Sequence, residues 1–257
     1  MSIEITNNKN TSPYAKKHPI WTVVIVELLL LIIMFAAGAY ATIKKVDDAT
    51  LPVLIAFIPI AIALIIYLSW KRRWRYMGFR PLLEIPKRGW LYYLPFVAVL
   101  AAISASGFKE VTSSELLYFL GFTLLVGFVE ETVYRGLILK ALLNKSIPTA
   151  VITSSVLFGI THLLNMLSGQ NLLDTIMQII YALLIGAALS LLIIKNNNIL
   201  PLILFHFIHN LIRFLSPEVA GTSINTPVIM DGLVILILLA QCIWIASSLK
   251  KKTKAIT

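Results

Sequence analysis

Long runs of apolar residues alternate with short polar stretches along the 257-residue chain. Each run is close to the roughly 20 residues that an α-helix needs to cross the hydrocarbon of a bilayer. None shows the apolar and polar alternation of a membrane β-strand. The pattern therefore predicts an all-α integral membrane helix bundle with about eight spans, at residues 20–43, 50–70, 90–107, 115–139, 147–167, 173–194, 199–215 and 228–249.

Composition supports this assignment. Hydrophobic residues make up 58% of the chain and charged residues only 13%, about half the charged fraction of an ordinary soluble domain. We expect a single membrane domain over residues 19–249, between a polar N-terminal tail (1–18) and a basic C-terminal tail (250–257). The lone Cys242 has no partner for an intramolecular disulfide, so we interpret it as a packing residue.

The net charge of +10 is distributed unevenly between the two sets of loops. With the N-terminus inside, most Lys and Arg residues fall on the inner face and most acidic residues on the outer face. The positive-inside rule then predicts that both termini are cytoplasmic. This distribution makes membrane lipids the expected partners, with no nucleic acid. The basic and aromatic segment 71–88 favours anionic headgroups, although a role in topology alone accounts for it.

Three charges stand inside the apolar run that we predict as the fourth span: Glu130, Glu131 and Arg135. A charge at bilayer depth costs roughly 2.5–3.5 kcal/mol on insertion scales, and such residues usually face the interior of a bundle. Glu131 and Arg135 are i,i+4 neighbours and can pair, whereas Glu130 points about 100° away and is left without that partner. Chemistry within the membrane is one interpretation, and a structural clamp of the three charges is the other.

Histidines in two further spans supply more polar groups at membrane depth. His162 follows Phe158 by one turn, and Gly159 between them permits close approach of a neighbouring helix. In the seventh span, His206, His209 and Asn210 lie along one stripe, so a His and an Asn can donate hydrogen bonds toward a common point. The structural alternatives are a core histidine and an interhelical polar clasp. Glu27 in the first span fits none of these groups.

Taken together, the motifs E-E-x-x-x-R, F-x-x-x-H and H-x-x-x-N, each in its own span and in this order, resemble one family. The chain is similar to the CPBP family, which comprises CAAX prenyl endopeptidase type II and bacteriocin-processing (Abi) intramembrane proteases. The resemblance covers roughly residues 115–215. The Tyr134-Arg135-Gly136 sequence also fits its pattern, while His209 is additional to it.

The resemblance implies an endopeptidase that hydrolyses a membrane-associated peptide or protein with an activated water. By this analogy the catalytic residues are Glu130 and His162, which activate the water, and His206 and Asn210, which hold the oxyanion. The supporting residues are Glu131, Arg135, Phe158 and His209.

Alternatives remain for both the mechanism and the function. Glu130, His162 and His206 form a His₂Glu set of the kind that binds catalytic zinc, yet no H-E-x-x-H motif is present, and we favour a site with no cofactor. A catalytically silent immunity or binding protein of the same fold is the main functional alternative, followed by a transporter. We expect a bacterial cytoplasmic membrane protein with a role in bacteriocin processing or self-immunity.

Overall fold

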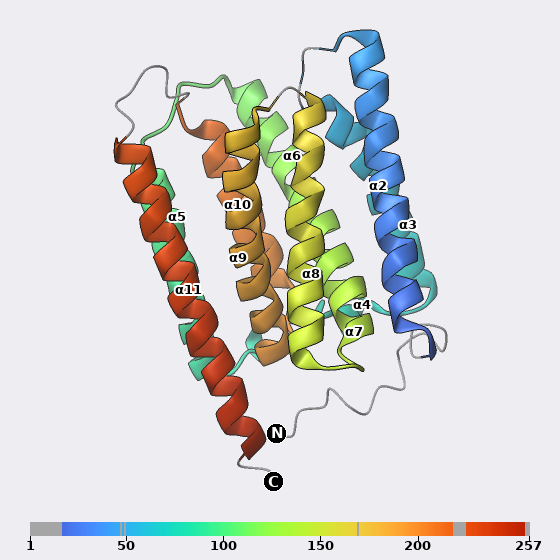
Figure 1. Ribbon diagram of the computed structural model, residues 1–257, viewed down its shortest axis with the longest axis vertical. Helices are drawn as coiled ribbons and strands as arrows, with labels where there is room; N and C mark the ends of the chain where they lie inside the picture. The colour runs from blue at the N-terminus through green and yellow to red at the C-terminus, as the bar shows by residue number, and fades with distance from the viewer. Residues whose placement is uncertain (1–16, 47, 49, 169, 218–224, 255–257) are drawn as a thin grey trace.

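In a computed structural model, the chain forms a bundle of helices (Figure 1). The structure describes residues 17–46, 48, 50–168, 170–217 and 225–254. The predicted tail 1–18 lies almost entirely outside the described residues, as does the end of the predicted tail 250–257. The elements are α2 (Pro19–Lys44), α3 (Leu51–Trp70), α4 (Trp74–Met77), η1 (Leu82–Glu84), η2 (Lys87–Tyr93), α5 (Leu94–Ser104), α6 (Ser113–Glu131), η3 (Thr132–Ile138), α7 (Leu139–Leu142), α8 (Ile147–Thr161), η4 (His162–Ser168), α9 (Leu172–Asn196), α10 (Leu200–Leu215) and α11 (Asn225–Lys254).

The described residues confirm the all-helical class, with six helical segments long and apolar enough to cross a membrane. Helices α6, η3 and α7 join into one such segment of 30 residues, Ser113–Leu142. Helix α5, with 11 residues, is shorter than the predicted span 90–107, whereas α10, with 16 residues, matches the predicted span 199–215. Neither helix alone has the roughly 20 residues of a full crossing. The segment before α5 is the 3₁₀ helix η2, in which Gly89 packs against Asn196. The count of eight spans therefore stays a prediction.

Local sequence explains where several helices begin. Thr112 and Glu115 form a reciprocal capping box at the start of α6, which satisfies backbone N–H groups that have no partner within the helix. The side chains of Ser146 and Asn171 accept hydrogen bonds from the first turns of α8 and α9 in the same way. These caps lie outside the long apolar runs, so the polar side chains mark the ends of the spans.

The helices pack in an order that differs from their order in the chain. Helix α6 lies along α10, α8 along α9, and α11 along α9 and α5, while α2 packs on α3. The start of α2 and the end of α11 lie at the same end of the bundle (Figure 1). Large apolar side chains remain exposed on the outer faces of α2, α3 and α11, which is the pattern of helices that face lipid.

Candidate active site

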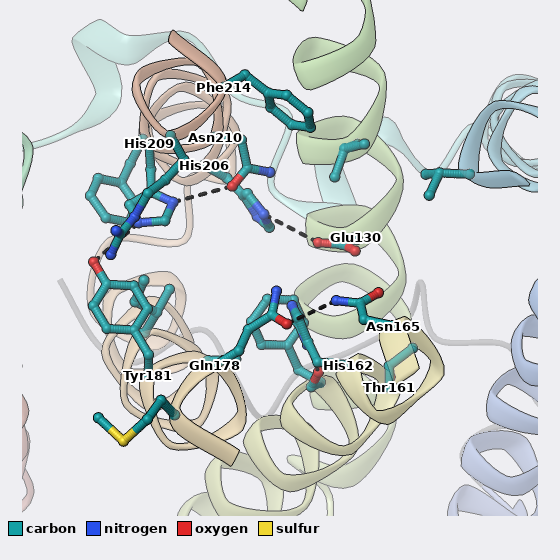
Figure 2. Close-up of a pocket in the computed structure, with 18 of the residues that line it drawn as sticks. Glu130, Thr161, His162, Asn165, Gln178, Tyr181, His206, His209, Asn210 and Phe214 are labelled. Atoms are coloured by element: carbon teal, nitrogen blue, oxygen red, sulfur yellow. Dashed lines mark hydrogen bonds and ion pairs between the residues drawn. The ribbon is translucent and has the colours of Figure 1, made fainter. Parts of the chain in front are cut away.

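The three sequence motifs meet around one cavity of about 490 Å³, which we call the polar cavity. Figure 2 shows Glu130, His162, His206 and Asn210 around it. Glu130 lies at the end of α6, His162 begins η4, and the other two residues lie on α10. Packing of α6 on α10, and of α8 on α9, thus joins residues that are far apart in the chain.

Glu131 and Arg135 form the predicted ion pair, with Arg135 Nη1 3.0 Å from Glu131 Oε1. Both side chains are 0% exposed. Arg135 belongs to η3, a π-helical turn that sequence reasoning did not predict. Single π-helical turns are rare and are frequently found at functional sites. The pair therefore offsets two buried charges where the helix departs from regular geometry.

His206 connects both carboxylates of the first motif. Its Nδ1 lies 2.9 Å from Glu131 Oε1 and its Nε2 lies 3.1 Å from Glu130 Oε2. Glu130, which has no partner on its own helix, thus finds one on α10. An ionised carboxylate can only accept hydrogen bonds. Both contacts are therefore hydrogen bonds if His206 carries a proton on each ring nitrogen, or if His206 is neutral and one of the two carboxyl groups is protonated. If His206 carries both protons, the two positive charges of His206 and Arg135 balance the two negative charges of Glu130 and Glu131. Burial favours such an arrangement, because an unpaired buried charge is costly.

Phe158 forms the aromatic wall between the three motifs. Its ring meets the rings of His162 and His206 edge-on, with ring centres 5.2 and 5.9 Å apart. The Arg135 guanidinium carbon lies 4.4 Å from the centre of the Phe158 ring, a favourable cation–π distance. Phe158 therefore covers the charged cluster with an apolar surface and contacts one residue from each motif.

His162 lines the polar cavity, and a backbone contact holds one of its ring nitrogens. Its Nδ1 lies 2.9 Å from the backbone carbonyl oxygen of Phe158. A carbonyl only accepts, so Nδ1 carries the proton of this hydrogen bond, and Nε2 of the neutral ring is then an acceptor. Glu130 and His162 both line the cavity, and no hydrogen bond joins them in the described part of the chain. The lining of the cavity thus contains both a carboxyl group and an imidazole.

His209, the additional histidine of the third motif, contacts Asn210 and Tyr181. Its Nδ1 is 3.1 Å from Asn210 Oδ1, and its Nε2 is 3.1 Å from the Tyr181 hydroxyl on α9. Because the amide oxygen accepts, His209 Nδ1–H donates, and Nε2 can accept from Tyr181. Figure 2 shows the Asn210 amide nitrogen turned away from His209, on the side of Glu130. This chain of contacts orients the Asn210 side chain.

Glycines allow the motif helices to approach closely. A Cβ atom on Gly127, one turn before Glu130, would lie 3.2 Å from the Ile203 carbonyl oxygen on α10. A Cβ atom on Gly159 would lie 2.9 Å from Leu183 Cγ on α9. The role predicted for Gly159 is confirmed, whereas sequence reasoning missed Gly127. A glycine one turn before the carboxylates was the signal that could have revealed it.

Glu27, which the sequence left without a group, lies next to the active-site helices. It is buried on α2, and its side chain interacts with that of Thr161, a residue of the polar cavity lining. Thr161 Oγ1 is also 2.5 Å from the Tyr134 hydroxyl. Side-chain contacts thus link Glu27 in the first span with Thr161, the residue before His162. In the sequence, the only indication of this link was a single Glu in an apolar helix.

Glu130, His162 and His206, the alternative zinc set, do not form a metal-ligand cluster in the described part of the chain. Both nitrogens of His206 contact carboxylates, and the Nδ1 of His162 contacts a backbone carbonyl. The arrangement instead places hydrogen-bonding groups around a cavity. It suits proton transfer and hydrogen bonding to a polar substrate.

Comparison with known proteins gives one family match, over the part of the chain that holds the motifs. The family model described as "Type II CAAX prenyl endopeptidase Rce1-like" matches residues 112–212, which contain all three motifs. No curated protein and no solved structure matches the chain significantly. The match confirms the family resemblance predicted from the motifs: over residues 112–212, the chain is similar to Rce1-like type II CAAX prenyl endopeptidases.

Proposed function

We propose that this protein is an intramembrane endopeptidase that hydrolyses a peptide bond with a water activated by Glu130 and His162. The observation that carries the proposal is the convergence of Glu130, His162, His206 and Asn210 on one cavity. The Rce1-like match over the helices that contribute these residues supports a CAAX-type protease. Fold resemblance alone would not support an activity, but the arrangement of reactive groups does.

In this mechanism the water lies between Glu130 and the Nε2 of His162. Glu130 removes a proton from the water, and the resulting hydroxide attacks the carbonyl carbon of the peptide bond. Protonation of Glu130 weakens its contact with His206 Nε2, so that N–H can donate to the new oxyanion together with the Asn210 amide. The proton on Glu130 then passes to the leaving nitrogen as the carbon–nitrogen bond breaks, and an acid and an amine are released.

Polar residues at one end of the bundle support the direction from which a peptide approaches. Asn165, Asp174, Gln178 and Arg213 line the polar cavity and lie near the end of α8, the start of α9 and the end of α10. The charge distribution predicts this end to be the outer one. We therefore propose that the substrate is a membrane-associated peptide that reaches the site from outside, such as a bacteriocin-related peptide.

The test is cleavage of a library of membrane-associated peptides by the purified full-length protein. Glu130→Gln and His162→Ala should each lower the rate at least about a hundredfold, because general acid–base catalysis typically contributes 10²–10⁴-fold. The matched control is Glu110→Gln, which changes an exposed carboxylate outside the cavity. Wild-type cleavage should persist with a metal chelator present. Equal cleavage by wild type and Glu130→Gln would refute the proposal.

A cellular assay separates the enzyme from a binding protein of the same fold. If cells that express the protein resist a bacteriocin, the proposal expects Glu130→Ala to abolish that resistance. Resistance that survives the substitution in protein of equal abundance would favour a binding role instead.

A further inference from the structure

A second cavity of about 490 Å³ lies between α2, α3 and the η3–α7 segment, and we call it the apolar cavity. Its walls are almost entirely hydrocarbon, from side chains such as Leu30, Ile60, Leu64 and Val133. Its volume falls within the roughly 300–1,000 Å³ typical of small-molecule sites. Leu29, which also lines it, is 55% exposed on the outer surface of α2, so the cavity adjoins the surface that faces lipid.

One end of the apolar cavity carries a positioned cation. Arg73, between α3 and α4, lines the cavity together with Tyr67 and Tyr76. Arg73 Nη1 donates to the Tyr67 hydroxyl at 3.0 Å, and its guanidinium carbon is 5.6 Å from the centre of the Tyr67 ring. These contacts orient the guanidinium at the cavity mouth and leave further N–H donors for a ligand, because a guanidinium carries five.

The charges around the mouth favour an anion. Arg75 and Arg80 both pair with Glu84, at 3.1 and 3.6 Å. Among the described residues, no carboxylate forms an ion pair with Arg73, and the exposed Lys71 precedes it by two residues. A guanidinium beside an apolar cavity matches a molecule with a negative head and a hydrocarbon tail, since Arg binds phosphate through paired N–H donors.

We propose that the apolar cavity binds an acyl chain of an anionic glycerophospholipid whose phosphate accepts hydrogen bonds from Arg73. An acyl chain brings no backbone N–H or C=O groups, which would be unsatisfied against these walls. The bilayer supplies such lipids directly. The charge distribution predicts that this end of the bundle faces the cytoplasmic leaflet, where anionic lipids attract basic segments. The site thus assigns a ligand to part of the basic segment 71–88.

Native mass spectrometry of the purified full-length protein tests the site. The probes are phosphatidylglycerol and phosphatidylcholine with identical palmitoyl and oleoyl chains. We expect tighter binding of phosphatidylglycerol. Arg73→Gln should weaken that binding about tenfold through loss of a charge-assisted hydrogen bond. Lys71→Gln removes a nearby charge outside the cavity lining and should change binding by no more than about twofold.

Two further variants separate headgroup recognition from chain insertion. Ala63→Phe fills the apolar cavity without changing charge and should weaken binding of both lipids. Arg73→Lys keeps the charge but loses the paired donors, so an intermediate loss is expected. Equal binding of the two lipids by the wild type would overturn the preference for an anionic lipid, and equal losses in Arg73→Gln and Lys71→Gln would overturn the Arg73 phosphate site. Unchanged binding by Ala63→Phe would overturn insertion of a chain into the cavity.

Discussion

The polar and apolar cavities have the same volume of about 490 Å³ and share one membrane span, yet their chemistry is opposite. The Ser113–Leu142 segment lines the polar cavity with Phe122, Val126 and Glu130, and the apolar cavity with Val133, Gly136 and Leu137. The change occurs where α6 passes into the π-helical turn η3. A single helix therefore offers reactive groups to one region of the bundle and hydrocarbon to another.

The contrast between the two cavities shows that buried charged side chains need closely placed partners, whereas apolar side chains do not. Beside the polar cavity, Glu131 pairs with Arg135 one turn along the same span and with His206 on α10, because an unmatched charge is costly at this depth. The apolar cavity needs only hydrocarbon along its walls and one cation at its mouth. We therefore expect substitutions that break partners at the polar cavity to have large effects, and changes in the apolar walls to have small ones.

The largest effect should come from Arg135→Met. It removes Arg135 from the buried Glu131 carboxylate, which then keeps only its contact with His206. Breaking a buried ion pair typically costs about 3–5 kcal/mol. Thermal unfolding of the detergent-solubilised protein measures the loss. The double variant Glu131→Gln with Arg135→Met should recover part of the stability, because neither charge remains. A single variant as stable as wild type would contradict the assigned role of the pair.

Gly127→Ala should have the next largest effect. The new Cβ would lie 3.2 Å from the Ile203 carbonyl oxygen and 3.3 Å from the Phe207 nitrogen, so α6 and α10 must separate, at a cost of about 1–3 kcal/mol. Peptide cleavage should fall as His206 moves away from the carboxylates. Gly121→Ala is the matched control on the same helix, since nothing lies within 4 Å of its Cβ position. Equal behaviour of the two variants in unfolding and cleavage assays would argue against the close approach.

Tyr181→Phe should have a smaller effect. It removes the hydroxyl that contacts His209 Nε2, and a typical hydrogen bond contributes about 0.5–1.5 kcal/mol. A less well fixed Asn210 side chain should lower kcat more than it raises KM, because in the proposed mechanism Asn210 donates a hydrogen bond to the oxyanion of the transition state. Tyr40→Phe, on the exposed surface of α2, is the control. A change in KM alone would place Tyr181 in substrate binding.

Ala63→Phe should change stability least. Ala63 is an exposed residue of the apolar cavity lining, and surface substitutions usually shift stability by no more than about 0.5 kcal/mol. Unfolding measured without added lipid tests this expectation. A loss as large as that of Gly127→Ala would remove the contrast between the two cavities.

Helical spacing made the local pairings of the candidate site predictable, because it brings side chains on one helix together. The i,i+4 spacing of Glu131 and Arg135 predicted their pair, and the apolar runs predicted where most helices lie. The match over residues 112–212 confirms the family resemblance on which the proposed roles rest. The ion pair and the positions of the helices depend on residues within a few turns of one another.

Other parts of the site depend on contacts between distant segments. The bond between Glu130 and His206 joins residues that are far apart in the chain. The partners of His209 and Glu27, on α9 and at the end of α8, arise in the same way. The π-helical turn η3 was not predicted, because its residues include no proline that would mark a departure from a regular helix.

By itself, the sequence determined that this chain is an all-α membrane protein with an acid, a base and hydrogen-bond donors at bilayer depth. Hydrophobicity and helical period act over short stretches of chain, so a single sequence records them directly. Only the tertiary structure decided which carboxylate meets which histidine and which apolar faces leave a cavity. Those outcomes depend on how closely helices pack, and that is set by shape across the bundle.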